Sequence, residues 1–101
     1  MANSEYGLRQ RVLLVFQVAL LGMVTPSLRG VTVGWKERRI RARCFFDGPT
    51  REAERDVCSD IEAEVLASFP DYEVEVHAER LDAPHDLGPG MLDAWVYRRK
   101  E

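Results

Sequence analysis

Two stretches of the chain alternate apolar and polar side chains with a period of two. In residues 39–46 the apolar positions are Ile40, Ala42, Cys44 and Phe46, separated by Arg39, Arg41, Arg43 and Phe45. In residues 72–81 they are Tyr72, Val74, Val76 and Ala78, separated by Glu73, Glu75, His77 and Glu79. Successive side chains of a strand point to opposite faces of a sheet. Both stretches are therefore predicted strands with one face on a core and one in water.

A further strand precedes the first of these stretches. Residues 29–35 alternate Val31, Val33 and Trp35 with Thr32 and Gly34, and Lys36-Glu37-Arg38 supplies a polar turn. The pattern predicts a hairpin formed by residues 29–35 and 39–46.

Two segments have the three-and-four spacing of amphipathic helices. In residues 6–24 the apolar positions are Leu8, Val12, Val15, Phe16, Ala19 and Met23, and Pro26 is expected to end the helix. In residues 50–68 they are Ala53, Val57, Cys58, Ile61, Val65 and Leu66, followed by Phe69. Thr50 is the expected N-cap of this second helix.

The remainder of the chain completes a small α+β fold. Residues 82–93 are rich in proline and glycine and are expected to form a loop without regular structure. Trp95-Val96-Tyr97 then offers a short last strand. The order α-β-β-α-β-(β) predicts a single domain over residues 1–101, a two-layer sandwich with a mainly antiparallel sheet and helices on one face.

The apolar run Val12–Val24 admits a second interpretation. Arg9 and Arg11 precede it, as basic residues precede the apolar centre of a signal peptide. The run has 13 residues, whereas a membrane span needs about 20. A buried helix is the favoured interpretation, with a signal peptide as the alternative. Two cysteines are too few for a disulfide framework, so we expect a cytoplasmic protein.

The first helix also has a second apolar stripe, nearly opposite the first. It consists of Leu14, Val18 and Leu21. A helix that is apolar on two sides is either sandwiched or offers one side to a partner. This stripe predicts a possible homodimer interface.

Charge is divided sharply along the chain. Residues 1–46 hold eight basic side chains and two carboxylates, whereas residues 47–97 hold three basic side chains and fourteen carboxylates. An asymmetry of this kind concerns partners and electrostatic steering rather than the fold. It predicts an acidic binding surface.

Two sets of carboxylates could form that surface. The second helix presents Glu52, Asp56, Asp60 and Glu64 at four-residue spacing, where like charges repel by a few tenths of a kcal/mol per pair. The third strand presents Glu73, Glu75 and Glu79. The helix set is either a solvated face or a docking stripe for a basic partner. The strand set is explained by ion pairs with the arginines of the second strand, by partner binding or, least well, by a metal.

Enzymatic and nucleic-acid-binding functions are disfavoured. His77 and His85 are the only histidines, and neither has a recognisable nucleophile beside it. The sequence has no glycine-rich phosphate loop, and its overall acidity opposes direct nucleic-acid binding. We expect no catalytic residues, no metal and no cofactor.

Several short motifs extend over most of the chain. They are LLGMVTPSLRGVTVGW, FFDG, FPD, RLDAP and the closing WVYRRKE. Together they resemble small bacterial immunity proteins encoded beside polymorphic or contact-dependent growth-inhibition toxins. The resemblance implies a cytoplasmic inhibitor that binds one cognate toxin domain, often a nuclease, and masks its active site. An acidic surface suits a basic, nuclease-like toxin. The alternative is a homo-oligomeric structural or adaptor module without catalysis.

Overall fold

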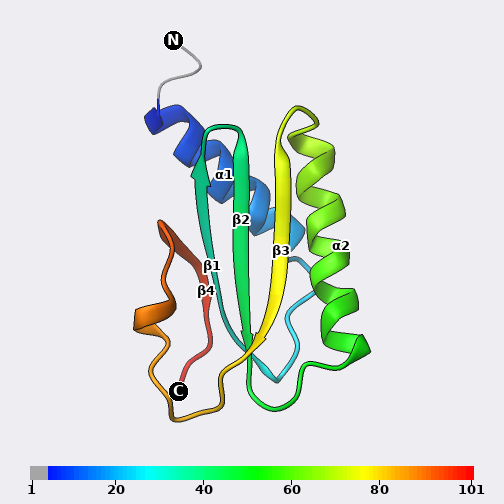
Figure 1. The fold of residues 1–101 in the computed structure, drawn as a ribbon, viewed down its shortest axis with the longest axis vertical. Coiled ribbons are helices and arrows are strands. Elements are labelled where there is room, and N and C mark those ends of the chain that lie inside the picture. Colours follow the sequence, from blue (N-terminus) through cyan, green and yellow to red (C-terminus); the bar gives the residue numbers. More distant parts are fainter. Residues whose placement is uncertain (1–4) are drawn as a thin grey trace.

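The computed structural model describes residues 5–101, and side chains from Gly7 onward. Its elements are α1 (Glu5–Ala19), β1 (Leu28–Lys36), β2 (Arg39–Phe46), α2 (Glu52–Ser68), β3 (Glu73–Arg80), a 3-10 turn η1 (Gly88–Gly90) and β4 (Ala94–Arg98). The four strands form one sheet in the order β3-β2-β1-β4 (Figure 1). The predicted α+β fold is confirmed.

The sheet is mixed. β1 pairs antiparallel with β2 and with β4, whereas β2 pairs in parallel with β3. A parallel neighbour needs a crossover connection, and α2 supplies it. The β1–β2 hairpin turns through Glu37 and Arg38, whose φ angles are +51° and +63°. Two consecutive left-handed residues match the right-handed twist of the flanking strands.

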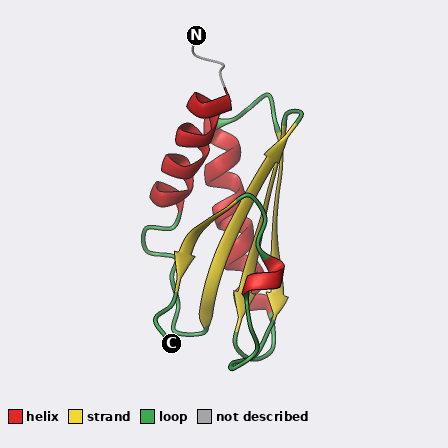
Figure 2. Cartoon of the chain, turned by 90° about the vertical axis from the view of Figure 1, so that its left-hand side faces the viewer, coloured by secondary structure: helices red, strands yellow, loops and turns green. Residues whose placement is uncertain are grey.

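Both helices lie on the same face of the sheet (Figure 2). α1 contributes Val12, Phe16 and Ala19 to the core, as the buried-helix interpretation predicted. α2 contributes Cys58, Ile61 and Val65, which pack with the inward side chains of the strands. Removing these apolar side chains from water is the main stabilising contribution to such a fold.

The ends of both helices differ from the predictions. α1 ends at Ala19, not near Pro26, because the chain tightens into i→i−3 hydrogen bonds and Gly22 adopts a φ of +78°. α2 begins one residue after Arg51, and Thr50 is not its cap. The Glu54 carboxylate accepts the Arg51 backbone N–H at 2.8 Å and so satisfies the first turn.

The outer face of the sheet is not uniformly solvated, contrary to the prediction. The segment between β3 and β4 folds back over one end of this face and contains the 3-10 turn at Gly88–Gly90, where no regular structure was expected (Figure 2). Phe45 and Thr32, both predicted to face water, are 2% and 0% exposed. A Cβ added to Gly90 would lie 2.6 Å from the Phe45 ring, so the covering segment needs glycine there.

Candidate functional site

The four helix carboxylates lie on the outer side of α2. Glu52, Asp56, Asp60 and Glu64 are all exposed. The opposite side of α2 is fixed to the core by Cys58, Ile61 and Val65, so the helix cannot rotate to hide them. Within residues 5–101 the four carboxylates take part in no hydrogen bond or ion pair of the structure. The helix therefore presents a row of negative charges without intramolecular partners.

The strand glutamates are in a different situation. Glu73 pairs with Arg39 at 3.2 Å, and Glu75 contacts the His77 ring at 3.1 Å. The hydrogen bond from His77 lowers the pKa of Glu75 below its ordinary value. The Glu73–Arg39 pair fits the ion-pair interpretation of the strand, because parallel pairing sets Arg39 beside Glu73, whereas Glu75 contacts a histidine of its own strand.

Glu79 is the most firmly held of the three. Both of its oxygens accept hydrogen bonds from Arg43, each at 2.7 Å, and this pairing lowers the pKa of Glu79. Arg43 also donates to the Gly90 carbonyl at 2.9 Å. A planar guanidinium matches a carboxylate with two parallel hydrogen bonds, which makes this pair stronger than a single contact. Glu79 thus helps to fasten the segment that covers the outer face.

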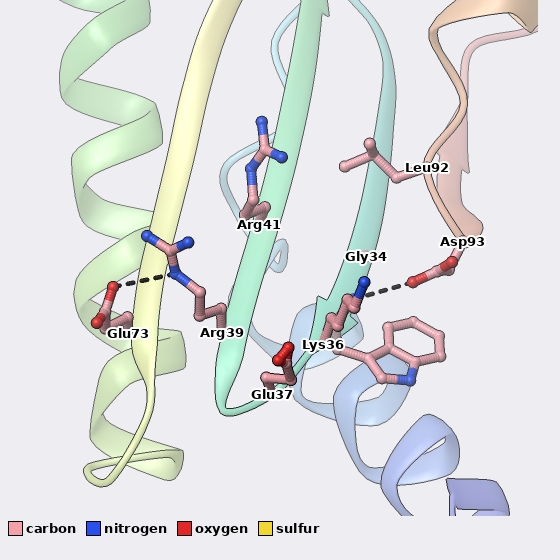
Figure 3. Close-up of a pocket in the computed structure, with 9 residues that line it drawn as sticks. Gly34, Lys36, Glu37, Arg39, Arg41, Glu73, Leu92 and Asp93 are labelled. Atoms are coloured by element: carbon pink, nitrogen blue, oxygen red, sulfur yellow. Dashed lines mark hydrogen bonds and ion pairs between the residues drawn. The ribbon is translucent and has the colours of Figure 1, made fainter.

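A pocket of about 740 Å³ opens at the other end of this outer face (Figure 3). Its lining comes from three strands and from the segment before β4: Gly34, Trp35, Lys36, Glu37, Arg39, Arg41, Glu73, Leu92 and Asp93. Asp93 accepts the Trp35 backbone N–H at 3.0 Å, which fixes one wall. The sequence patterns gave no indication of this hollow, because Leu92 and Asp93 lie far along the chain from the hairpin.

Part of the charge asymmetry of the sequence remains in the structure, although the ion pairs Arg39–Glu73 and Arg43–Glu79 join its basic and acidic halves. Lys36, Arg38 and Arg39 gather at the β1–β2 turn. The turn before β3 lies beside them, since the Glu73 N–H donates to the Arg38 carbonyl at 2.9 Å. This basic end of the molecule is distinct from the acidic outer side of α2.

The second apolar stripe of the first helix is exposed. Leu14, Val18 and Leu21 have 67%, 57% and 74% of their surface in water. Gln17 lies between them in sequence and donates to the Val96 carbonyl at 3.1 Å. The stripe is therefore available to a partner, as its predicted use in a dimer requires.

Arg29 was not singled out by the sequence patterns, although it is 2% exposed. Its guanidinium donates to the Glu101 carboxylate at 2.7 and 2.8 Å and to the carbonyls of Leu81 and His85. These contacts tie the C-terminal residue and the covering segment to β1. No local pattern marks the residue, because its partners are distant in sequence.

Both histidines contact neighbouring groups of the chain. His85 Nδ1 contacts the Asp82 carbonyl at 3.0 Å, and His77 contacts Glu75. Within residues 5–101, no three side chains of histidine, cysteine, aspartate or glutamate are grouped as a metal site would need.

Comparison with known proteins gives the chain a family. The protein-family model described as "MafI2 immunity protein" matches residues 9–101. The chain belongs to this family. The match covers both helices and all four strands apart from the first residues of α1. It confirms the resemblance to immunity proteins, and family membership implies a toxin as the partner and an inhibitory rather than a catalytic role.

The remaining comparisons concern the fold. A solved structure titled "MamM CTD - Copper form" matches with a TM-score of 0.50 and 17% identity, over 81% of this chain and 91% of that chain. At this identity the likeness shows a shared fold only. No curated protein sequence matches the chain significantly. Among the described residues, no helix has the length and apolar character needed to cross a membrane.

Proposed function

We propose that this member of the MafI2 immunity family neutralises its cognate toxin in the cytoplasm by docking the acidic outer side of α2 on a basic, nuclease-like toxin domain. Glu52, Asp56, Asp60 and Glu64 are the contacting groups. Inhibition is by steric and electrostatic occlusion, without catalysis, cofactor or direct contact with nucleic acid. The toxin belongs to a polymorphic or contact-dependent growth-inhibition system.

One observation carries this proposal. The four α2 carboxylates are exposed and lack intramolecular partners among the described residues, whereas Glu73, Glu75 and Glu79 each pair with a neighbour. A carboxylate that is already paired must exchange one partner for another on binding, and the exchange returns little free energy. An unpaired carboxylate can gain a charged partner outright. The strand set is therefore the secondary candidate.

The spacing on α2 agrees with a docking role. Like charges four residues apart cost a few tenths of a kcal/mol per pair in the free protein. A basic surface would relieve this repulsion on binding. A nuclease domain must hold a polyanion and so carries a positive field at its site. A rigid row of carboxylates is complementary to such a field and accelerates association.

The test is charge reversal on α2. In Asp56→Lys/Asp60→Lys, we expect the affinity for the toxin domain encoded beside this chain's gene to fall about 100-fold, or ~2.8 kcal/mol. Most of the salt dependence of the association rate should disappear with it. Folding should be unchanged or slightly improved, because repulsion along α2 is relieved. Binding kinetics at low and physiological salt provide the measurement.

A matched control distinguishes an effect of the α2 carboxylates from an effect of the net charge of the protein. Asp71 is an exposed carboxylate outside the α2 row and has no hydrogen bond or ion pair among the described residues, so Asp71→Lys is compared with Asp56→Lys alone. This control should bind nearly as tightly as the wild type. If Asp56→Lys/Asp60→Lys retains full affinity, the α2 face is not the docking surface, and Glu73, Glu75 and Glu79 become the leading candidates.

A homo-oligomeric module is the second candidate, favoured by the exposure of Leu14, Val18 and Leu21. A second copy could cover this stripe without involving α2's carboxylates. Sedimentation of the free chain at micromolar concentration decides this point. A dimer that Val18→Glu converts to a monomer supports the candidate, and a wild-type monomer removes it.

A further inference from the structure

The pocket on the outer sheet face contains two cations, Arg41 and Lys36, without a hydrogen bond or ion pair among the described residues; Arg41 interacts with Glu75 and Glu79 only through longer-range charge attraction. Arg41 projects from the central strand β2, and Figure 3 shows it without a partner among the lining residues. Lys36 is exposed at the end of β1. Within residues 5–101 neither side chain makes a hydrogen bond or ion pair of the structure.

The other charges of the pocket are already engaged, except for Glu37 in the turn. Arg39 and Glu73 pair with each other, and Asp93 is held by the Trp35 N–H. Across β3, the neighbour of Arg41 is Glu75, which contacts His77. The groups left to attract a ligand are therefore mainly the guanidinium of Arg41 and the ammonium of Lys36.

The walls suit a short peptide segment. Gly34 lies opposite Arg41 in the β1–β2 pairing, and the absence of a side chain there lets Leu92 and Asp93 pack closely against β1. A Cβ at Gly34 would lie 3.2 Å from both Leu92 and Asp93, so these residues closely border the floor. Trp35 and Leu92 add apolar surface. A guanidinium fork beside apolar walls is a common arrangement for binding a carboxylate-bearing side chain.

We propose that this pocket receives an acidic side chain of the toxin, with Arg41 as the bidentate anchor and Lys36 as a supporting charge. The inference rests on the proposed function and extends it. The chain would hold its toxin through two surfaces, the acidic α2 side and the pocket, in which Arg41 is the anchoring cation. Two such contacts fix the orientation of the toxin more tightly than one.

The composition of the pocket favours a carboxylate over a nucleic acid. Glu37, Glu73 and Asp93 border it, so the pocket holds as many carboxylates as cations and lacks the strong positive field that binding of a chain of phosphates requires. A single free guanidinium satisfies one carboxylate, whereas binding of a polyanion relies on several phosphate contacts.

The test measures the toxin affinity of Arg41→Gln and Lys36→Gln. We expect about a tenfold loss for Arg41→Gln and a smaller loss for Lys36→Gln. Arg41→Lys should recover only part of the affinity, because an ammonium cannot form the two parallel hydrogen bonds. The matched control is Lys100→Gln, which removes one positive charge at an exposed position outside the pocket and the α2 row. It should bind as tightly as the wild type or more tightly.

The outcomes distinguish this inference from the proposed function. If Arg41→Gln and Lys36→Gln bind like the wild type while Asp56→Lys/Asp60→Lys does not, the pocket proposal is overturned and the α2 proposal stands. If the wild type does not bind the toxin, both are wrong. A single-stranded RNA oligonucleotide is the competing probe. Saturable binding of it that Arg41→Gln abolishes would replace the peptide ligand with nucleic acid.

Discussion

At the scale of single residues, Glu101 makes contacts in the structure that no pattern in the sequence indicates. In the sequence it closes the charged tail Arg98-Arg99-Lys100-Glu101. In the structure its carboxylate accepts hydrogen bonds from buried Arg29 and pairs with Arg99 at 3.1 Å. The hydrogen bond from Arg29 is the main reason why the pKa of Glu101 falls to about 2. Neither partner is local, so the period-two pattern could not reveal the contact.

This contact predicts a specific pH dependence. A carboxylate whose pKa is lowered by folding stabilises the protein above its unfolded pKa of about 4.5, and that contribution is lost as the pH falls toward about 2. Glu101→Gln should therefore lower the urea midpoint at neutral pH. The difference between the two chains should shrink steadily on acidification through this range. The pKa of Asp82 is also about 2. Asp82 is present in both the wild type and Glu101→Gln, so its contribution to the pH dependence cancels when the two are compared.

Urea unfolding from neutral pH to pH 2 provides the measurement. Lys100→Gln is the control, since it alters an exposed charge next to Glu101 and should shift the midpoint little at any pH. A difference between wild type and Glu101→Gln that does not change with pH would contradict this account of the contact.

At the scale of elements, a helix side chain makes a hydrogen bond to each edge strand of the sheet. On β3 the Val76 N–H donates to Glu62 of α2 at 2.9 Å. On β4 the Val96 carbonyl accepts from Gln17 of α1 at 3.1 Å. Edge strands expose unpaired backbone groups that invite pairing with other chains. These two contacts each occupy one backbone group of an edge strand.

The β3 contact can be tested by hydrogen exchange. In Glu62→Ala the Val76 amide loses its acceptor, worth ~1 kcal/mol, and its exchange should become about fivefold faster. Other β3 amides should change less. Glu64→Ala removes a carboxylate of α2 that makes no such bond and should leave Val76 unchanged. Equal protection of Val76 in Glu62→Ala and wild type would show that the bond contributes nothing to the edge.

Much of the element order could be predicted from the sequence, because the patterns that indicate strands and helices involve residues close together in the chain. The alternation of residues 39–46 and 72–81 and the helical spacing around Ile61 and Val65 each depend on near neighbours in the chain. The ends of the helices were predicted less well. Tertiary packing and the left-handed Gly22, rather than Pro26, end α1.

The features that depend on distant residues could not be predicted. Phe45 appeared to face water because its covering segment, around Gly90, lies more than forty residues later. The pocket has the same origin, since Leu92 and Asp93 meet the hairpin only in the folded chain. The α2 carboxylates were predictable because four-residue spacing alone sets them on one helix face.

At the scale of the whole molecule, ion pairs across the sheet neutralise part of the division of charge along the sequence, and two surfaces with unpaired charges remain. The acidic row occupies the outer side of α2, and the cations of the β1–β2 hairpin border the pocket at one end of the sheet. The two surfaces belong to different elements of one rigid sandwich. A partner that contacts both must itself carry a basic region and an acidic group.

The most direct test is carboxyl footprinting of the complex with the toxin. Carbodiimide-driven labelling followed by mass spectrometry compares the reactivity of each exposed carboxylate in the free and the bound chain. The account predicts that labelling of Asp56 and Asp60 falls several-fold on binding, while Asp86 in the covering segment stays reactive as an internal control. If Asp56 and Asp60 label equally fast in the complex and in the free protein, α2 does not dock on the toxin and the central claim is wrong.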